Sequence, residues 1–207
     1  MAKDKKSKHE AEEAASGPAP PARMRLQWND EVSPKVGEQF ELPNPMSRPR
    51  LRKIVINVNM GRHLEGNKIP AHVKDTVLAT LTKISGQKPV VIKAKKSVSN
   101  FKVREGADSS AMVTIRRDRM WHFLDRLINL SIPRIKDFRG LPADAFDKGG
   151  NYAMGLSEQG VFPEIDMANT NFVHGMNINL VFSDSNPEMS RFALEQLGFP
   201  FKKPEQR

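Results

Sequence analysis

The sequence predicts an α+β fold with a mostly antiparallel sheet. Several stretches place apolar residues at every second position, which is typical of half-buried strands. These stretches are mixed with about four segments whose apolar residues recur at helical spacing. The connections between the elements are too uneven in length for repeated strand–helix–strand units, which argues against a parallel sheet. With 207 residues, the chain is long enough for one or two domains with a hydrophobic core.

The N-terminal region divides into a polar extension and a helix. Residues 1–22 consist mainly of Lys, Glu, Ala and Pro, with almost nothing to bury, and we expect them to be disordered. Residues 23–40 place apolar side chains at intervals of four, which predicts an amphipathic helix. Ser33 and Pro34 fit a cap and a first helical position, so the helix is expected to begin or kink there. Its apolar residues are Met24, Trp28, Val32, Val36 and Phe40.

A strand over residues 50–59 and a helix over residues 67–85 are predicted next. The strand alternates between Ile54, Ile56 and Val58 on one side and Lys53, Val55, Asn57 and Asn59 on the other. Asn57 and Asn59 have two interpretations: turn formation at the strand end before Gly61, which suits Asn59 better, or amides that contact sugar or base edges of RNA. Gly86 supplies a helix stop.

The segment from Lys88 to Arg104 is the most unusual of the chain. Six of its 17 residues are Lys or Arg, none is acidic, and apolar residues lie between the charges. Two interpretations are equally supported by this segment alone: a folded surface that faces a polyanion, or a Lys-rich edge strand that deters aggregation. We expect a strand at residues 89–93, a basic connection, a second extended piece through Phe101 and Val103, and a flexible turn at residues 105–110.

The remaining chain predicts two more strands and two more helices. A strand over residues 111–116 precedes a helix that Asp118 caps and that ends before Pro133. Trp121 falls within the apolar pattern of that helix, whose other members are Met120, Phe123, Leu124, Leu127, Ile128 and Leu130, and is assigned to the core. Residues 141–171 read as a long irregular region. A strand over residues 173–182 and a helix from Asn186 complete the chain.

Charge is concentrated in one part of the sequence. The whole chain carries a net charge of +9, whereas residues 45–140 hold 21 basic and seven acidic residues, a net of +14. The flanking regions are close to neutral or acidic. Such an asymmetry favours an anionic partner that docks on one region, and nucleic acid is the first candidate.

Several function classes find no support in the sequence. The chain has no cysteine and no apolar run of membrane-spanning length, so we expect a soluble, intracellular protein without a membrane contact. The five histidines are scattered, without metal-ligand spacing. The glycine-rich segment GGNYAMG lacks the Lys and Ser or Thr of a phosphate loop. We therefore expect no enzyme activity, no metal and no cofactor.

Several long motifs resemble one known family. ISGQKPVVIKAKKSVSNFKVREG, RMWHFLDRLINLSIPRIKDFRGL, GGNYAMGLSEQGVFPEI and the closing FPFKK resemble the bacterial large-subunit ribosomal protein family that binds 5S rRNA, the "L five" family. The resemblance covers roughly residues 24–203, nearly all of the chain outside the N-terminal extension. It implies one α+β domain, residues 23–207, with a protruding loop. It also implies a cytoplasmic, ribosome-bound protein.

The resemblance further implies partners and site residues. The partners are 5S rRNA, 23S rRNA, the peptidyl-site tRNA and neighbouring proteins of the central protuberance. By motif, the rRNA-binding positions are Asn59, Gln87, Lys93, Lys95, Lys96, Ser97, Thr114, Arg116, Arg134, Asp137 and Arg139. The tRNA-facing loop is reached through Phe101, Lys102, Arg104 and Gly106.

Two departures from the family pattern bear on these assignments. The family's loop commonly reads R-x-G-x-P-x-G, whereas here the Pro and the second Gly are missing and Glu105 and Asp108 are acidic. Acidic side chains weaken the case for a phosphate contact there. The family's I-N-M-G-x-G becomes INVNMGRH, which is compatible with an inserted pair of residues or a β-bulge.

Two other functions remain as alternatives to a ribosomal constituent. The first is a free RNA-binding regulator or chaperone on the same scaffold. The second is an RNA-processing enzyme, for which the sequence offers no catalytic residues. Recovery with large ribosomal subunits after sedimentation would separate the ribosomal constituent from the free regulator.

Overall fold

A single five-stranded antiparallel sheet organises the molecule. The computed structural model describes residues 20–63, 68–167, 170 and 172–202. The strand order is β2-β3-β1-β5-β4, and all four neighbouring pairs are antiparallel. The strands are β1 (Arg50–Asn59), β2 (Val90–Lys93), β3 (Asp108–Ile115), β4 (Tyr152–Leu156) and β5 (Met176–Ser183). The predicted α+β class and the mostly antiparallel sheet are confirmed.

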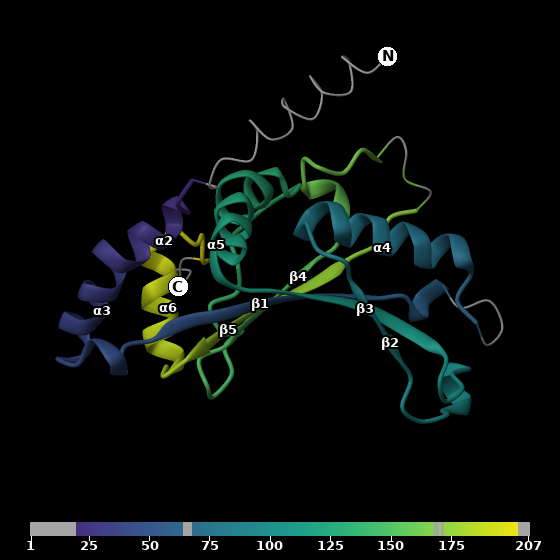
Figure 1. Ribbon diagram of the computed structural model, residues 1–207, viewed down its shortest axis with the longest axis horizontal. Helices are drawn as coiled ribbons and strands as arrows, with labels where there is room; N and C mark the ends of the chain where they lie inside the picture. The colour runs from purple at the N-terminus through teal and green to yellow at the C-terminus, as the bar shows by residue number, and fades with distance from the viewer. Residues whose placement is uncertain (1–19, 64–67, 168–169, 171, 203–207) are drawn as a thin grey trace, which may run out of the picture.

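Helices cover one side of the sheet and one of its ends (Figure 1). The helices are α2 (Arg23–Gln27), α3 (Ser33–Gln39), α4 (Ala71–Ser85), α5 (Arg117–Arg126) and α6 (Pro187–Gln196). Figure 1 shows α4 and α5 above the sheet, while α2, α3 and α6 gather at the left end. The connection between β2 and β3 projects at the right end. The other side of the sheet carries no helix among the described residues.

Alternation along the strands decides which side is buried. Ile54, Ile56 and Val58 of β1 have no exposed surface, and their neighbours Val55 and Asn57 on the opposite side are half-buried. Cross-strand partners share a side, so Ile56 lies beside Val113 of β3 and Ile178 of β5, which are also buried. The predicted alternation of β1 is therefore confirmed. Its pairing with β3 is continuous from Ile54 to Asn59, without the bulge that INVNMGRH suggested.

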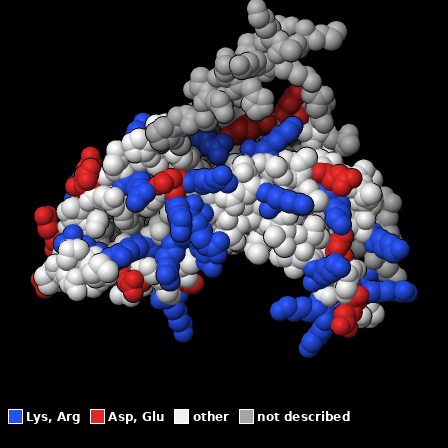
Figure 2. Space-filling model, in the orientation of Figure 1, with Lys and Arg blue, Asp and Glu red and all other residues white. Residues whose placement is uncertain are grey.

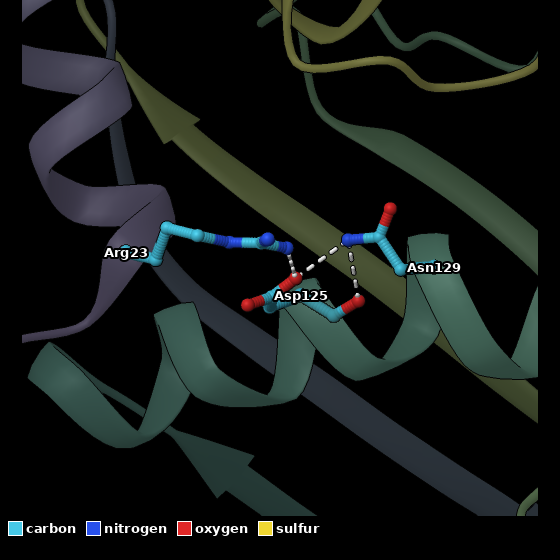
Figure 3. A network of polar contacts seen from close by, with 3 residues as sticks. All are labelled: Arg23, Asp125 and Asn129. Atoms are coloured by element: carbon cyan, nitrogen blue, oxygen red, sulfur yellow. Dashed lines mark hydrogen bonds and ion pairs between the residues drawn. The ribbon is translucent and has the colours of Figure 1, made fainter.

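The N-terminal helix is continuous through Pro34. A π-helical segment, Trp28–Val32, joins α2 to α3, and Pro34 lies in the first turn of α3 without a break in the helix. Arg23 of α2 donates to the Asp125 carboxylate of α5 at 2.6 Å, and Asn129 donates to the same oxygen at 2.5 Å (Figure 3). Trp28 packs on Trp121 with ring centroids 5.5 Å apart, which confirms Trp121 as a core residue.

Three predicted helix boundaries are wrong. The helix expected from residue 67 begins at Ala71, because Pro70 has a non-helical backbone, with φ of −56° and ψ of 143°, and Asn67 lies outside the described residues. The helix expected from Asp118 begins at Arg117, and Asp118 pairs with Arg25 instead of capping. That helix also runs past Pro133, through a π-helical segment, Leu127–Ser131, and a 3₁₀ turn, Ile132–Arg134. Leu130, expected on its buried face, is 49% exposed.

Three predicted extended or irregular segments are also corrected. The extended piece expected through Phe101 is a 3₁₀ turn, Ser99–Phe101. Strand β3 begins at Asp108 and ends at Ile115, so it takes up part of the expected flexible turn and leaves Arg116 outside. The irregular region expected over residues 141–171 contains β4, which pairs with β5 from Tyr152 to Leu156. The small residues Ala153 and Gly155 masked the alternation of that strand.

The N-terminal extension lies almost entirely outside this description. The disorder expected for residues 1–22 concerns residues 1–19, which the structure does not describe. Ala22, at the end of that range, is buried against the core, and its carbonyl accepts from the amides of Arg25 and Leu26. No described helix is long and apolar enough to cross a membrane.

Candidate nucleic-acid interface

The connection between β2 and β3 forms a compact basic tip, defined here as residues 93–107. Backbone hydrogen bonds close its base, from the Ala94 amide to the Ala107 carbonyl at 2.8 Å and from the Gly106 amide to the Ala94 carbonyl at 3.0 Å. Further out, Val98 and Val103 exchange two backbone hydrogen bonds of 2.9 and 3.2 Å. Lys102 turns the chain in a left-handed conformation, with φ of 52°. The tip is thus an ordered excursion and not an open loop.

The tip brings together eight of the residues singled out from the sequence. They are Lys93, Lys95, Lys96, Ser97, Phe101, Lys102, Arg104 and Gly106. All eight are exposed, and Phe101 is exposed to 72%. The Ser97 hydroxyl accepts from the Glu105 amide at 2.9 Å, so this side chain holds the tip together. Five cations and one exposed aromatic ring on one projection suit phosphate contacts and base stacking.

The two acidic residues of the tip region have different environments. Asp108 forms an ion pair with Lys74 of α4 at 2.6 Å, and both side chains are half-buried. This pair ties the base of the tip to the helix layer and compensates the Asp108 charge. Glu105 is exposed. Only Glu105 therefore opposes the positive field of the tip directly.

The side of the sheet opposite the helices is polar and nearly uncharged. We call this surface the open face. The register places its members on a common side: Val55 and Asn57 of β1, Met112 and Thr114 of β3, Asn177 and Asn179 of β5, and Ala153 and Gly155 of β4. Three asparagines and one threonine lie among small or apolar side chains. Amide and hydroxyl groups on a flat, accessible sheet can contact sugars and base edges.

Asn57 and Asn59 differ in what their side chains do. The Asn59 oxygen accepts from the Gly61 amide at 2.8 Å, which is the turn interaction expected at a strand end. The Asn57 oxygen is buried and has no hydrogen-bond partner among the described residues. The sequence suggested the same two interpretations for Asn57 as for Asn59, although only Asn59 was then assigned as an rRNA-binding position by motif. Thr114 lies across from Val55 on the open face.

Gln87 lies apart from the open face, in the connection between α4 and β2. Its backbone amide donates to Ser85 Oγ at 3.2 Å, and that hydroxyl in turn donates to the Leu81 carbonyl at 2.6 Å. These two bonds fix the backbone of Gln87 at the end of the helix, and its side chain is half-buried. The preceding Gly86, with φ of 64°, ends α4 as expected.

A second basic surface lies at the end of the sheet where α2, α5 and β1 meet. Arg25, Arg50, Arg52 and Arg117 line a groove of about 480 Å³ together with both tryptophans. We call it the arginine groove. Arg25 is engaged with Asp118 at 2.5 Å, whereas Arg50 contacts the Pro45 carbonyl at 3.4 Å. Arg116, predicted as an RNA contact, directly precedes α5 beside this groove. Sequence reasoning missed the groove, because its arginines come from three separate segments.

The remaining predicted residues lie on the β4 side of the sheet. Arg134, Asp137 and Arg139 are exposed in the segment that follows α5. That segment ends at Leu141, which pairs with the C-terminal Phe201, and Phe201 packs against Tyr152 at the start of β4. The basic tip lies beyond β2, at the opposite edge. The structure therefore does not join these three residues to the tip.

Basic side chains gather in two separate places in the space-filling view. Figure 2 shows one group toward the centre-left, where α5 and β1 meet, and another around the tip at the lower right. A hollow with few charges separates the two groups on the underside. The surface thus alternates positive, neutral and positive along the length of the molecule.

Three described side chains have pKa values shifted from their ordinary range, two of them buried and one exposed. Burial raises the pKa of Tyr152 to about 12, and its hydroxyl donates to the Pro142 carbonyl at 3.0 Å. Hydrogen bonds from Asn151 lower the pKa of Asp147. Burial also lowers the pKa of His174. Within the described residues, no group of three His, Asp or Glu side chains is arranged to hold a metal ion.

Comparison with known proteins gives consistent matches over most of the chain. Residues 44–104 match a family described as Ribosomal protein L5, and residues 108–201 match the C-terminal region of the same ribosomal family. A large ribosomal subunit protein uL5 from Desulfatibacillum aliphaticivorans is 46% identical over 180 residues, covering 87% of this chain and 98% of the relative. The same-named protein from Kocuria rhizophila is 46% identical, covering 87% and 93%. That from Syntrophotalea carbinolica is 42% identical, covering 88% and 97%.

Proposed function

The chain belongs to the Ribosomal protein L5 family, and from this premise we propose that it binds 5S rRNA and links it to 23S rRNA in the central protuberance. As a member of this family, the chain is a structural constituent of the large ribosomal subunit and not an enzyme. Its action is then docking, without chemistry on a substrate.

The observation that carries the proposal is the order of the surfaces along the molecule: basic, nearly uncharged and basic. Cations that meet phosphates supply most of the affinity for RNA, and amide or hydroxyl groups that meet sugars and base edges supply register and selectivity. The open face offers Asn57, Thr114 and Asn179 between two basic surfaces. An RNA element on the open face would meet phosphate contacts at the tip, and the arginine groove would remain available to a second RNA.

Two basic surfaces also fit a protein that joins two RNA molecules. We assign the open face and the first half of the tip, through Ser97, to 5S rRNA. The arginine groove and the segment with Arg134 and Arg139 are then available to 23S rRNA. These surfaces lie on different parts of the sheet, so both RNAs can be bound at once.

The outer half of the tip is assigned to the peptidyl-site tRNA. Phe101 is exposed to 72%, although a ring of this size is normally buried. Together with Lys102 and Arg104, it offers stacking and phosphate contact on one projection. The position in the central protuberance also implies contacts with neighbouring ribosomal proteins.

A double substitution in the tip tests the 5S rRNA assignment. Lys95→Ala with Lys96→Ala removes two exposed cations and should weaken 5S rRNA binding by about 10- to 100-fold in a filter assay. The matched control is Lys35→Ala with Lys83→Ala, which removes two exposed cations from α3 and α4 and should change the affinity by no more than about twofold. Equal losses in both variants would move the RNA contact away from the tip.

Salt dependence and sedimentation provide two further checks. If about six cations of residues 88–104 meet phosphates, log affinity should fall with log salt at a slope of about −4 to −5. A slope near zero would exclude the electrostatic contribution. In sedimented cell lysate, the protein should be recovered in proportion to large subunits, whereas a mostly free pool would favour an RNA-binding regulator.

A further inference from the structure

A polar pocket lies at one end of the open face, beside the region assigned to 5S rRNA. It has a volume of about 550 Å³ and lies where β1, β4 and β5 meet. Its walls include Asn57, Arg62, His63, Gly155, His174 and Asn177. Pockets that hold small organic ligands span roughly 300–1,000 Å³, so the size suits one nucleotide.

Two buried polar atoms of this pocket lack partners. The Asn57 oxygen and the His174 Nε2 atom are both buried without a hydrogen bond among the described residues. His174 itself is only 5% exposed. Leaving a buried polar atom unpaired is costly, and such atoms in native proteins are nearly always satisfied by a partner, a water or a ligand. Asn57 and His174 are both lining residues of the same pocket, which indicates that a ligand completes it.

The local hydrogen bonds fix what kind of ligand this is. His174 Nδ1 lies 3.3 Å from the Gly175 carbonyl oxygen, which can only accept, so Nδ1 carries the hydrogen. Burial and the nearby His63 both lower the pKa of His174, which keeps the ring neutral near pH 7. In that tautomer Nε2 is an acceptor. The pocket therefore presents two acceptors, Asn57 Oδ1 and His174 Nε2, and calls for a ligand with N–H donors.

The walls suit a flat ring attached to a phosphate. The His63 and His174 rings line the pocket, and Phe172 packs on both, with ring centroids 4.8 and 5.7 Å away. Gly175 has no room for a side chain, because a Cβ atom there would lie 2.7 Å from the Leu156 carbonyl oxygen. Arg62 is exposed at the rim and supplies a cation.

We propose that this pocket holds one unpaired nucleobase with an exocyclic amino group, extruded from the RNA that docks on the open face. The proposal rests on the function proposed above and adds a base-selective position to it. Adenine, cytosine and guanine carry an amino group whose two hydrogens can donate to both Asn57 and His174. Uracil has a single N–H donor, at N3, flanked by two carbonyl oxygens that would face the two acceptors. Unpaired bases are the usual targets of sequence-specific RNA recognition, and aromatic side chains are the usual stacking surfaces.

Nucleoside monophosphates test the pocket without the rest of the RNA. The full-length protein, labelled with ¹⁵N in histidine, is titrated with AMP, CMP, GMP and UMP while the His174 Nε2 resonance is followed. The three amino-bearing nucleotides should shift that resonance, and UMP should leave it in place. Asn57→Ala should abolish the shifts, whereas Asn179→Ala, on the same face but outside the pocket, should not. No shift with any nucleotide, or an equal shift with UMP, would overturn the proposal.

Measuring the affinity for 5S rRNA distinguishes an error in the pocket proposal from an error in the proposed function. His174→Phe keeps an aromatic ring but removes the acceptor, and it should weaken 5S rRNA binding by about 10- to 100-fold with an unchanged salt slope. A circular dichroism melt shows whether this variant folds, and Asn57→Ala repeats the test at a half-buried position. If both variants bind 5S rRNA like wild type while Lys95→Ala with Lys96→Ala does not, the pocket proposal fails and the proposed function stands.

Discussion

The basic tip and the open face are built from opposite kinds of residue. The tip carries five exposed cations and one exposed ring, on a projection held by a few backbone hydrogen bonds and by the Lys74–Asp108 pair. The open face carries amides and a hydroxyl on paired strands, whose other side is the fully buried core around Ile56. One surface is strongly charged and extends away from the fold. The other carries mainly uncharged side chains, with Lys53 at one end, and is part of the sheet.

This difference separates two contributions to RNA binding. Phosphate contacts raise the affinity for every RNA and depend strongly on salt, whereas contacts to base edges discriminate between sequences and depend on salt weakly. A projecting tip can reach phosphates without a fixed geometry. Base-edge contacts need a rigid frame, which the sheet supplies. We therefore expect changes in the tip to alter affinity and changes in the open face to alter selectivity.

Removing the tip should have the largest effect on RNA binding. Residues 95–106 are replaced by Asn-Gly, which joins Ala94 to Ala107 at a point where their backbones already bond. Four cations are lost, of which Lys95 and Lys96 belong to the half assigned to 5S rRNA. The 5S rRNA affinity at low salt should therefore fall on the order of 100-fold, and the salt slope should become less negative by about 1.4 to 1.8. The thermal midpoint should stay near that of wild type. A large drop in that midpoint would show that the tip is part of the folding unit.

The two sides of β1 should respond very differently to truncation. Ile56→Ala removes a side chain with no exposed surface and should lower the free energy of unfolding by about 3 to 4 kcal/mol. Val55→Ala, its half-buried neighbour on the open face, should cost about 1 kcal/mol or less. Urea unfolding measures both. Similar losses would mean that the open face is as tightly packed as the core, contrary to its description as an accessible surface.

Local sequence patterns predicted the regular strands and helices better than the irregular ones. In β1, β5 and α4, one side is buried and carries the apolar residues. The spacing of those residues in the sequence therefore reveals each element. Strand β4 was missed because Gly155 and Ala153, on its open side, replace the larger polar residues that mark alternation. The prediction stopped the helix before Pro133, whereas the chain stays helical beyond α5, through a π-helical segment and a 3₁₀ turn that contains this proline.

The candidate interface was predictable only where it is continuous in sequence. The tip is one uninterrupted basic segment, so its eight residues were found together. The arginine groove combines Arg25, Arg50 and Arg117 from three elements that only the fold brings together. The unpaired Asn57 oxygen and the pocket lined by His174 depend on burial and hydrogen bonding. Neither property can be read from the type of a single residue.

Alkaline pH should lower the free energy of unfolding through Tyr152, which lies in the sheet, and should not act through the tip. Tyr152, the sole tyrosine, has a pKa of about 12, above its ordinary value of 10.0, because it is buried. The folded state therefore holds this proton more tightly than the unfolded state. The associated stability is fully present below pH 10 and is lost between pH 10 and 12, up to about 2 to 3 kcal/mol. Absorbance at the tyrosinate band reports the titration directly. Tyr152→Phe removes that part of the pH dependence, and an ordinary pKa in wild type would contradict it.

The smallest expected effect comes from the one exposed acid of the tip. Glu105→Gln removes a negative charge among five cations without touching the backbone bond from the Glu105 amide to Ser97. Surface charges are well screened, so 5S rRNA affinity should rise by only about twofold at 0.1 M salt, and the gain should vanish at high salt. Asp30→Asn on the N-terminal helix is the control and should change nothing. A loss of affinity in Glu105→Gln would mean that this carboxylate accepts a hydrogen bond from the RNA, which would make the tip a selective contact as well as a charged one.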